Sequence, residues 1–443
     1  MNHIPVREAG HRVKERVACA SGTVHVIIFH GMKNLHSPEL PRAAARVVAD
    51  ALGVMPVVVV TGARQTGKST LVRSHPCLAD HPYVTLDDPL IRDQAREDPA
   101  SLLLRGEQLI LDEVQRAPDL LLAVKAAVDL DSPRRPGRYV LTGSANLLLM
   151  HRVSESLAGR AHYLRLGPLS RAERMGRGSV GPWSELLAVS WREWPDLLRE
   201  REAVPGDWRE ESALGGLPVP AHALDSARAR ALWFDGYVET YLERDLQLLA
   251  RIDSLGDFRR LIRAAALRVG SVLNQADLAR DVAVSAPTVH RWLNLLETSF
   301  QVVRVEAFAV NRTKRLIKGP KLYWSDVGLA RHLAGGEAVG AHLENLILSD
   351  LLVWREMEAP RPSIFHWRTT NQEEVDFVVE AGRRLLAVGV KAGRRPSRRD
   401  VRHLLTFQRE YKDAVAGCLL LHDGSDVLPL ADGVVAAPWW TVV

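Results

Sequence analysis

Short apolar runs that end in polar residues recur along the first third of the chain. The runs at Val57–Val60, Leu109–Leu111 and Tyr139–Leu141 have the length and continuous apolar character of strands buried on both faces. An amphipathic helix is predicted over Pro41–Leu52, just before the first of them. The pattern predicts an α/β domain with a parallel sheet, in which the carboxyl ends of the strands face a ligand crevice.

Composition narrows the class of protein only modestly. At 443 residues the chain is long enough for two to four domains, and its 47% hydrophobic and 25% charged residues are ordinary for a globular protein. The net charge of +5 permits nucleic acid as a partner without requiring it. Three cysteines without metal-ligand spacing favour a reducing compartment, and no apolar run reaches the length of a membrane span. We therefore expect a cytoplasmic protein without membrane contact.

The first apolar run leads directly into a phosphate-binding pattern. Gly62-x-x-x-x-Gly67-Lys68-Ser69 stands between a predicted strand and a predicted helix, which is the context of a P-loop. Lys68 would reach the β- and γ-phosphates of ATP, and the Ser69 hydroxyl would ligate Mg²⁺. A chance spacing in a turn is the alternative, but the strand and helix around it favour nucleotide binding. The predicted nucleotide-binding residues are Gly62, Ala63, Arg64, Gln65, Thr66, Gly67, Lys68, Ser69, Thr70 and Ser144.

The second apolar run ends in Asp112-Glu113, about 45 residues after the P-loop. This is the Walker B pattern of P-loop ATPases, in which Asp112 would hold Mg²⁺ directly or through water. Glu113 could polarise the attacking water as general base. Many strands end at acidic turns, so the pattern gains its meaning from its place after the P-loop.

The third run ends in Thr142, Ser144 and Asn146, which are candidates to sense the γ-phosphate or to orient water. An ordinary strand-to-turn exit explains them equally well. Arg160 follows, and its guanidinium could serve as an arginine sensor or finger. The predicted catalytic residues are thus Lys68, Glu113 and Arg160, with Ser69 and Asp112 as metal ligands.

A helix-turn-helix spacing extends from Gln275 to Leu296. Ser285 could cap its second helix, and Ala283 stands where a glycine is common in the turn. Thr288, His290 and Arg291 would then be exposed where a recognition helix meets a major groove. Five nearby cations would strengthen phosphate contact if they share that face: Arg312, Lys314, Arg315, Lys318 and Lys321. Such a domain can also be a packing module, so DNA binding stays open.

The last hundred residues have the order of a restriction-endonuclease-like fold: an acid on a helix, an Asp at a hairpin, and a strand that bears a lysine. Glu344 and Asp376 would ligate Mg²⁺ there, and Lys391 would assist the nucleophile. Gly389 occupies the position two residues before the lysine where a carboxylate is needed, so we expect the fold without nuclease activity. The basic run that follows could hold an acidic partner or be a solvated loop: Arg394, Arg395, Arg398, Arg399 and Arg402.

Taken together, the motifs resemble a bacterial AAA-type family of P-loop ATP-binding proteins with a C-terminal domain of unknown function. The resemblance rests on Thr61–Thr70, Leu111–Gln115, Leu141–Ala145, Glu155–Arg160, Tyr241–Asp245, Tyr323–Leu329, Glu344–Leu346 and Glu374–Phe377. It implies an α/β P-loop NTPase domain with a parallel sheet, a winged helix-turn-helix middle domain and an α/β restriction-endonuclease-like C-terminal domain. The first 38 residues and a Trp-rich insert near residues 180–210 fall outside it.

These patterns divide the chain into five expected segments and suggest two main functions. The segments are a poorly specified N-terminal extension (1–38), the ATPase domain (39–172), a helical lid or linker (173–250), the winged helix-turn-helix domain (251–338) and an inactive endonuclease-like domain (339–443). The leading hypothesis is an ATP-binding protein, a Mg²⁺-dependent ATPase whose nucleotide state controls the C-terminal modules. The alternative is a nucleotide-gated DNA-binding regulator with little turnover. Double-stranded DNA, a protein partner and a homo-oligomer all stay open, and an arginine finger acting in trans would require at least a dimer.

Overall fold

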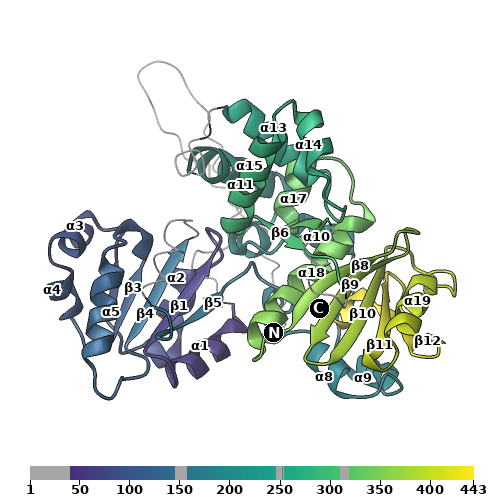
Figure 1. Cartoon of the computed structure of the whole chain (residues 1–443), viewed down its shortest axis with the longest axis horizontal. Coiled ribbons are helices and arrows are strands. Elements are labelled where there is room, and N and C mark those ends of the chain that lie inside the picture. The colour runs from purple at the N-terminus through teal and green to yellow at the C-terminus, as the bar shows by residue number, and fades with distance from the viewer. Residues whose placement is uncertain (1–39, 145–156, 246–251, 253, 310–318) are drawn as a thin grey trace, which may run out of the picture.

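The computed structural model describes residues 40–144, 157–245, 252, 254–309 and 319–443. These residues form three bodies, namely a P-loop sheet with its helices, a helical middle part and a C-terminal sheet (Figure 1). The sequence predictions on Asn146, Glu155, Arg312, Lys314, Arg315 and Lys318, and on the side chains of Glu243–Asp245, lie outside the described residues.

The N-terminal body is built on five parallel strands in the order β2-β3-β4-β1-β5. The strands are β1 (Val57–Gly62), β2 (Tyr83–Thr85), β3 (Leu109–Asp112), β4 (Tyr139–Ser144) and β5 (Ala161–Arg165). The helices and turns that accompany them are α1 (Ala44–Leu52), α2 (Lys68–Ser74), η1 (Pro76–Leu78), α3 (Pro89–Glu97), α4 (Pro99–Leu103), η2 (Val114–Arg116) and α5 (Leu120–Leu130). Every residue of β1, β3 and β4 is buried, as the continuous apolar runs predict. Two separate apolar cores lie in this body, on the two faces of the sheet.

The segment that follows the P-loop sheet, where a helical lid or linker was expected, is helical in the structure. It contains α7 (Arg171–Arg174), α8 (Trp183–Ala188), α9 (Trp194–Glu200), α10 (Trp208–Leu214), η3 (Val219–Ala223), α11 (Ala227–Tyr237) and η4 (Val238–Asp245). Helices α8 and α9 pack on strands of the C-terminal sheet, and Trp183 and Trp194 are fully buried. A side chain at Gly417 would meet the Trp194 ring at 2.6 Å, so only glycine lets the indole approach so closely. The lid interpretation is therefore wrong for these two helices.

The middle body contains the expected pair of helices and a small sheet. Its elements are α13 (Leu255–Ala266), α14 (Gln275–Val282), α15 (Ala286–Thr298), β6 (Val302–Val305), β7 (Lys321–Trp324) and α17 (Val327–Ala334). The Ser285 side chain accepts from the Thr288 N–H at 3.3 Å, which caps α15 as predicted. Ala283 has φ 56°, the left-handed conformation in which glycine is common. Strands β6 and β7 pair antiparallel after these helices.

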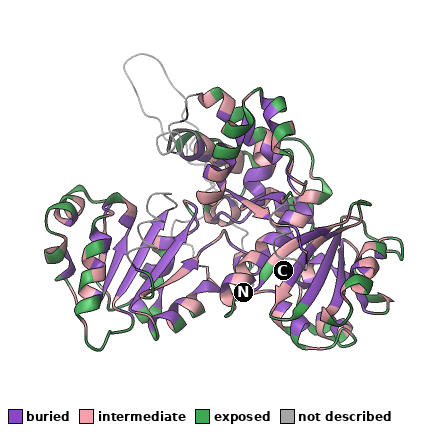
Figure 2. Ribbon diagram, viewed as in Figure 1, coloured by how far each residue is buried: buried purple, intermediate pink, exposed green. Residues whose placement is uncertain are grey.

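The C-terminal body is a six-stranded mixed sheet in the order β12-β13-β11-β10-β9-β8. Its elements are α18 (Gly340–Met357), β8 (Ser363–Arg368), β9 (Glu374–Ala381), β10 (Arg384–Lys391), α19 (Arg402–Tyr411), η5 (Lys412–Ala414), β11 (Val415–His422), β12 (Leu428–Ala431), β13 (Val434–Pro438) and η6 (Trp439–Thr441). One continuous apolar core runs from α8 through the middle body to this sheet, so the boundary expected at residue 339 does not separate two cores. Figure 2 shows the buried interior continuing between these two bodies.

Candidate functional site

The P-loop follows β1, which lies inside the parallel sheet between β4 and the edge strand β5. Gly62 has φ 153°, and a side chain there would meet the Leu166 carbonyl oxygen at 2.2 Å, so this position requires glycine. Gln65 and Gly67 also have positive φ, of 61° and 89°, which turn the loop back toward α2. Ala63, Arg64 and Thr66 complete the loop, and Lys68, Ser69 and Thr70 form the first turn of α2.

Lys68 is 5% exposed and lies under the loop. Its ammonium donates to the carbonyl oxygens of Gly62 at 3.2 Å and Ala63 at 2.7 Å. Burial lowers the pKa of Lys68 to about 8, although the carboxylates of Glu113 and Asp112 act in the opposite direction. This ammonium is therefore desolvated and held by neutral carbonyls, which is an arrangement that an anion would stabilise.

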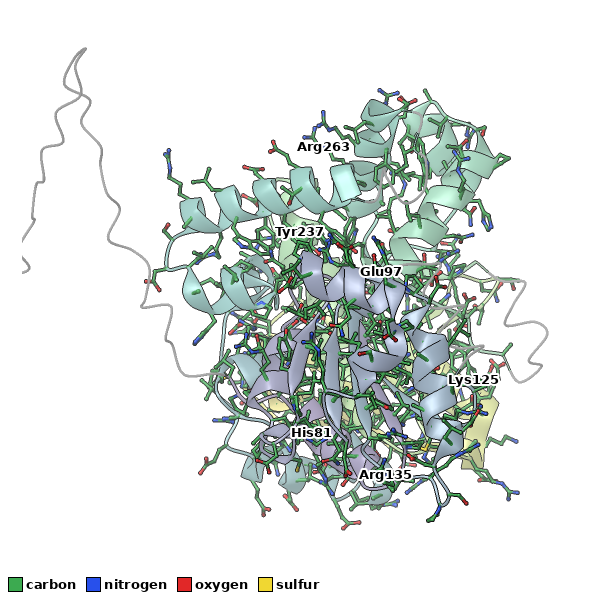
Figure 3. The ribbon with its side chains drawn as sticks, turned by 90° about the vertical axis from the view of Figure 1, so that its left-hand side faces the viewer. His81, Glu97, Lys125, Arg135, Tyr237 and Arg263 are labelled. Atoms are coloured by element: carbon green, nitrogen blue, oxygen red, sulfur yellow. The ribbon has the colours of Figure 1, made fainter. Side chains whose placement is uncertain are left out.

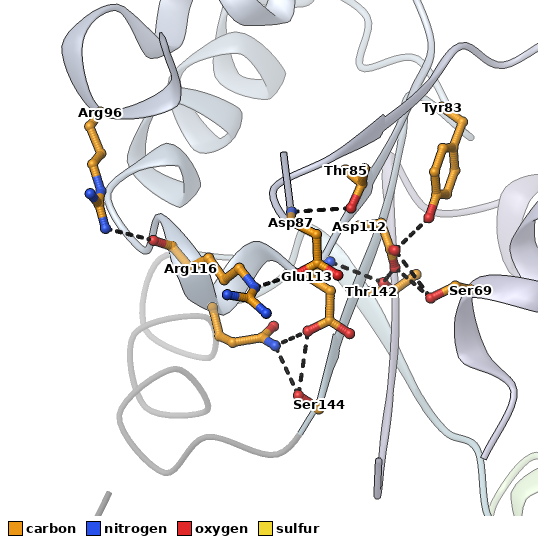
Figure 4. A network of polar contacts seen from close by, with 11 residues as sticks. Ser69, Tyr83, Thr85, Asp87, Arg96, Asp112, Glu113, Arg116, Thr142 and Ser144 are labelled. Carbon is orange, nitrogen blue, oxygen red and sulfur yellow. Dashed lines mark hydrogen bonds and ion pairs between the residues drawn. The ribbon is translucent and has the colours of Figure 1, made fainter. Parts of the chain in front are cut away.

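Asp112 is the acceptor for hydroxyl groups from three elements (Figure 4). Ser69 Oγ donates to its two carboxylate oxygens at 3.0 and 3.1 Å, and Tyr83 OH donates to Oδ2 at 2.5 Å. Thr142 Oγ1 donates to Oδ1. The Ser69 hydroxyl and the Asp112 carboxylate are hard oxygen ligands side by side next to the P-loop, and this donor set suits Mg²⁺. The sequence had indicated both as metal ligands but had missed Tyr83, whose position at the start of β2 gave no chemical signal.

Glu113 points away from Asp112, toward the end of β4 (Figure 4). It has φ 58°, which breaks the strand after Asp112 and sends consecutive carboxylates in different directions. Gln115 Nε2 donates to Glu113 Oε2 and, at 2.9 Å, to Ser144 Oγ. Ser144 Oγ lies 3.4 Å from Glu113 Oε2 as well. The two predicted residues thus lie together, and Gln115 is a connecting residue to which the sequence analysis gave no role.

Arg42, which the sequence did not indicate as a site residue, contacts the P-loop through the backbone of Thr66. Its guanidinium donates to the carbonyl oxygens of Thr66 at 2.7 Å and Gly167 at 2.8 Å and pairs with Glu173 at 3.1 Å. Since Glu173 is fully buried, this pair is shielded from solvent. It therefore ties the P-loop to the segment that leaves β5.

Arg160 does not lie at the P-loop of its own chain. Its carbonyl oxygen accepts from Val57 N at the start of β1, the opposite end of the strand from Gly62. Its guanidinium pairs with Asp129 at 2.7 Å. Figure 3 labels His81 and Arg135 near the end of the sheet at which β1 begins, and both lie well below the labelled Tyr237. The prediction of a sensor within the same chain is wrong because parallel strands carry their N-terminal ends away from the ligand crevice.

The structure brings together two of the three C-terminal residues proposed for a nuclease and leaves the third, Lys391, apart from them. Glu344 and Asp376 come together, but around Lys321 of β7, which is 1% exposed. The Lys321 ammonium lies 2.5 Å from Glu374 and 3.2 Å from Asp376. Lys391 is exposed at the end of β10, and Gly389 packs against Leu404 and Leu420. In the described residues no group of three or more His, Cys, Asp or Glu side chains could hold a metal ion.

The helix-turn-helix presents the residues that the sequence assigned to its surface. His290 and Arg291 are exposed, Thr288 is half-buried, and Trp292 and Leu293 are in the core. Most arginines around them are neutralised by acids, in the pairs Arg260–Asp257, Arg268–Asp281, Arg280–Asp277 and Arg304–Glu297. The described part of the chain contains no helix long and apolar enough to cross a membrane.

Comparison with known proteins covers nearly the whole chain. Residues 55–175 match the family described as AAA domain, and residues 206–339 and 339–442 match two families described as domains of unknown function. An uncharacterized protein of Mycobacterium tuberculosis is 33% identical over 410 residues, which is 90% of this chain and 83% of the relative. An uncharacterized protein of Haemophilus influenzae is 23% identical over 62% of this chain and 64% of its own length.

Two solved structures are similar at low identity. A Walker-type ATPase of Pyrococcus abyssi aligns with 67% of this chain and 98% of its own, at 17% identity and a TM-score of 0.42. A RuvB variant of Thermotoga maritima aligns with 60% of this chain and 90% of its own, at 16% identity and a TM-score of 0.29.

Proposed function

Because this chain belongs to a family of AAA-type P-loop proteins that carry a C-terminal domain of unknown function, we propose that it binds ATP with Mg²⁺ and hydrolyses it. The P-loop fold and the family support ATP binding at the level of the class. The observation that carries the proposal further is the adjacency of Lys68, Ser69 and Asp112. A buried ammonium without a paired carboxylate lies next to a hydroxyl and a carboxylate that form one oxygen-ligand site.

Each side chain has a separate role in this proposal. Lys68 exchanges its bonds to the Gly62 and Ala63 carbonyls for bonds to the β- and γ-phosphates, which return a counter-charge to a desolvated ammonium. Ser69 and Asp112 hold Mg²⁺, which when bound neutralises charge on the phosphates. Glu113 takes the proton of the attacking water, and Ser144 and Gln115 hold its carboxylate in position.

Two substitutions test this assignment on the full chain. Lys68→Ala should abolish ATP binding, measured by calorimetry with ATP and Mg²⁺. Glu113→Gln should keep ATP binding and lower the rate of phosphate release by about 100-fold or more. Turnover at the parental rate in the Glu113 variant would show that this carboxylate is not the base.

We further propose that the nucleotide state controls the C-terminal modules through three contacts with the P-loop body. The Arg64 guanidinium of the loop lies 5.3 Å from the centre of the Tyr241 ring on η4. Arg165, at the end of β5, lies over the Phe300 ring at 4.5 Å, and burial lowers the pKa of Arg165 to about 10. Arg42 adds the link from Thr66 to Glu173. A loop that moves on binding phosphate therefore moves against Tyr241 of η4 and, through Arg42, against Glu173 of α7.

The second candidate is a nucleotide-gated DNA-binding regulator that uses the exposed face of α15. The exposure of His290 and Arg291 favours it, while the paired arginines around them oppose it. Salt-dependent retention on duplex DNA that Arg291→Ala weakens would support this function. ATP hydrolysis measured with and without DNA separates the two candidates.

In a dimer, Arg160 of one copy could still act on the site of another, and the oligomeric state in solution tests that role.

A further inference from the structure

Two short segments of this chain each have a net charge of +5, residues 312–321 and residues 391–402, and most of the first lies outside the described residues. Residues 391–402 hold six cations and one acid, which give the segment a net charge of +5. The whole chain also has a formal net charge of +5, so the remaining residues are balanced. We call this segment the basic loop, and its cations are Lys391, Arg394, Arg395, Arg398, Arg399 and Arg402.

All six cations are exposed, where β10 ends and α19 begins (Figure 1). Arg394 has an acid within reach, Asp423 at 3.7 Å, and its side chain is still 84% exposed. The other five have no ion pair with an acid among the described residues. This differs from the described part of the middle body, where Arg260, Arg268, Arg280 and Arg304 are paired with acids, so the basic loop keeps its positive charge uncompensated at the surface.

The basic loop is held by the Asp400 side chain within it and by backbone contacts with the residues that follow β11. Asp400 accepts from the Ser397 N–H at 2.8 Å and from its hydroxyl at 2.6 Å, which closes the turn between the arginines. Asp423 N donates to the Gly393 carbonyl at 3.1 Å. A side chain at Gly424 would meet the Arg394 carbonyl oxygen at 2.0 Å, so the loop lies directly on the β11 exit. A fixed backbone lowers the entropy lost when the side chains bind.

We propose that the basic loop binds the phosphate backbone of nucleic acid without regard to base sequence. Five of its six cations are arginines, whose planar forks match phosphate oxygens and whose charge is permanent. Phosphate contact needs only such cations at a surface, whereas a membrane or protein surface would also use apolar anchors. The loop itself holds no large exposed apolar side chain. This surface is separate from the ATP site and from the face of α15.

The test measures binding of the full-length protein to a labelled duplex of about 25 base pairs by fluorescence anisotropy, at several salt concentrations. One variant replaces Arg394, Arg395, Arg398 and Arg399 with Gln. The matched control carries the same charge change at four exposed arginines elsewhere, namely Arg46, Arg105, Arg228 and Arg383. The loop variant should lose at least about tenfold in affinity, and its plot of log affinity against log salt should be less steep by about 3 to 4.

The control variant should bind within about threefold of the parent, and a second duplex of unrelated sequence should bind equally well. Both variants should keep the parental affinity for ATP, since neither touches the P-loop. Equal loss in the loop and control variants would overturn the proposal in favour of a general charge effect. Loss only in Arg291→Ala would assign the contact to α15 instead. Binding of polyglutamate or phosphatidylserine vesicles without binding of DNA would also overturn it.

Discussion

Lys68 and Lys321 are both buried lysines, but their surroundings are opposite. Among the described residues, the Lys68 ammonium has hydrogen bonds to two backbone carbonyls and to no carboxylate, and burial lowers its pKa to about 8. Burial acts in the same direction on Lys321, but the carboxylates of Asp376, Glu344 and Glu374 outweigh it and raise its pKa. The nearby carboxylates of Glu113 and Asp112 only partly offset the burial of Lys68, whereas Lys321 is in direct contact with three acids.

This difference in surroundings distinguishes a lysine that a bound anion would stabilise from a lysine that serves as an internal structural contact. A buried cation without an acid is costly for the empty protein, and a bound anion relieves that cost. A buried cation among three acids is already compensated and has no need of a ligand. Lys321 also comes from β7, while its partners lie on α18 and β9, so the cluster joins the middle body to the C-terminal sheet. Burial and Asp376 raise the pKa of Glu344, which Tyr323 contacts at 2.9 Å.

The largest effect is expected on breaking the compensated cluster. Lys321→Ala removes the buried cation from between three half-buried carboxylates, of which Glu374 keeps Arg368 at 3.6 Å, and should lower the free energy of unfolding by about 3–5 kcal/mol. Urea denaturation checks this, with exposed Lys391→Ala as the control, for which a change within about 0.5 kcal/mol is expected. A loss below about 1 kcal/mol in the Lys321 variant would show that the cluster does not stabilise the fold.

Removal of the buried lysine at the P-loop should have the opposite effect and stabilise the protein without nucleotide. Lys68→Met removes a buried cation whose desolvation outweighs the attraction of Glu113 and Asp112, and the lowered pKa corresponds to a penalty of about 3 kcal/mol at neutral pH. The carbonyls of Gly62 and Ala63 then lose their donor, so we expect a net gain of about 1–2 kcal/mol in the same urea measurement. A clear destabilisation without nucleotide would contradict the comparison with Lys321.

The pKa of Lys68 predicts how ATP binding depends on pH. Because the pKa of the empty site is about 8, the fraction of charged Lys68 falls about tenfold between pH 7 and pH 9, and ATP affinity should fall with it. The stability of the empty protein has the opposite sign. The folded lysine loses its proton before the unfolded one, so its burial penalty is present below pH 8 and is relieved as pH rises toward 10.5.

Lys68→Arg is the control for this titration, because a guanidinium stays charged over the same range. Its ATP affinity, whatever its value, should be flat between pH 7 and pH 9 in calorimetry. A parental protein whose affinity is equally flat would place the pKa of Lys68 well above 9.

The smallest effect concerns Tyr83, which donates to Asp112 at 2.5 Å. Burial and this hydrogen bond raise the pKa of Tyr83, which therefore stays a donor at all physiological pH values. Tyr83→Phe should raise the Mg²⁺ concentration for half-maximal ATPase activity by about three- to tenfold, in line with one hydrogen bond. Tyr139→Phe is a matched control, since the described structure gives the buried Tyr139 hydroxyl no partner. An equal shift in both variants would remove Tyr83 from the metal site.

Local sequence patterns gave correct predictions where the chemistry lies within a few residues. The P-loop fold class is confirmed, and Ser69 and Asp112 do lie together beside Lys68. Arg160 was misplaced because a motif gives the order of residues and not the end of the sheet at which they lie. Tyr83, Gln115 and Arg42 were missed because each acts through a contact with a residue far away or without a motif of its own.

The sequence by itself determined the P-loop, because glycines, a lysine and a hydroxyl at fixed spacing between a buried strand and a helix are typical of this motif. It also determined the charge of the basic loop. Only the tertiary structure decided which groups surround Lys321. Lys321, Glu344 and Asp376 lie far apart along the chain, and whether acids face a metal, a substrate or an internal ammonium depends on how β7 packs on α18 and β9. The pKa values of the two lysines differ for that reason.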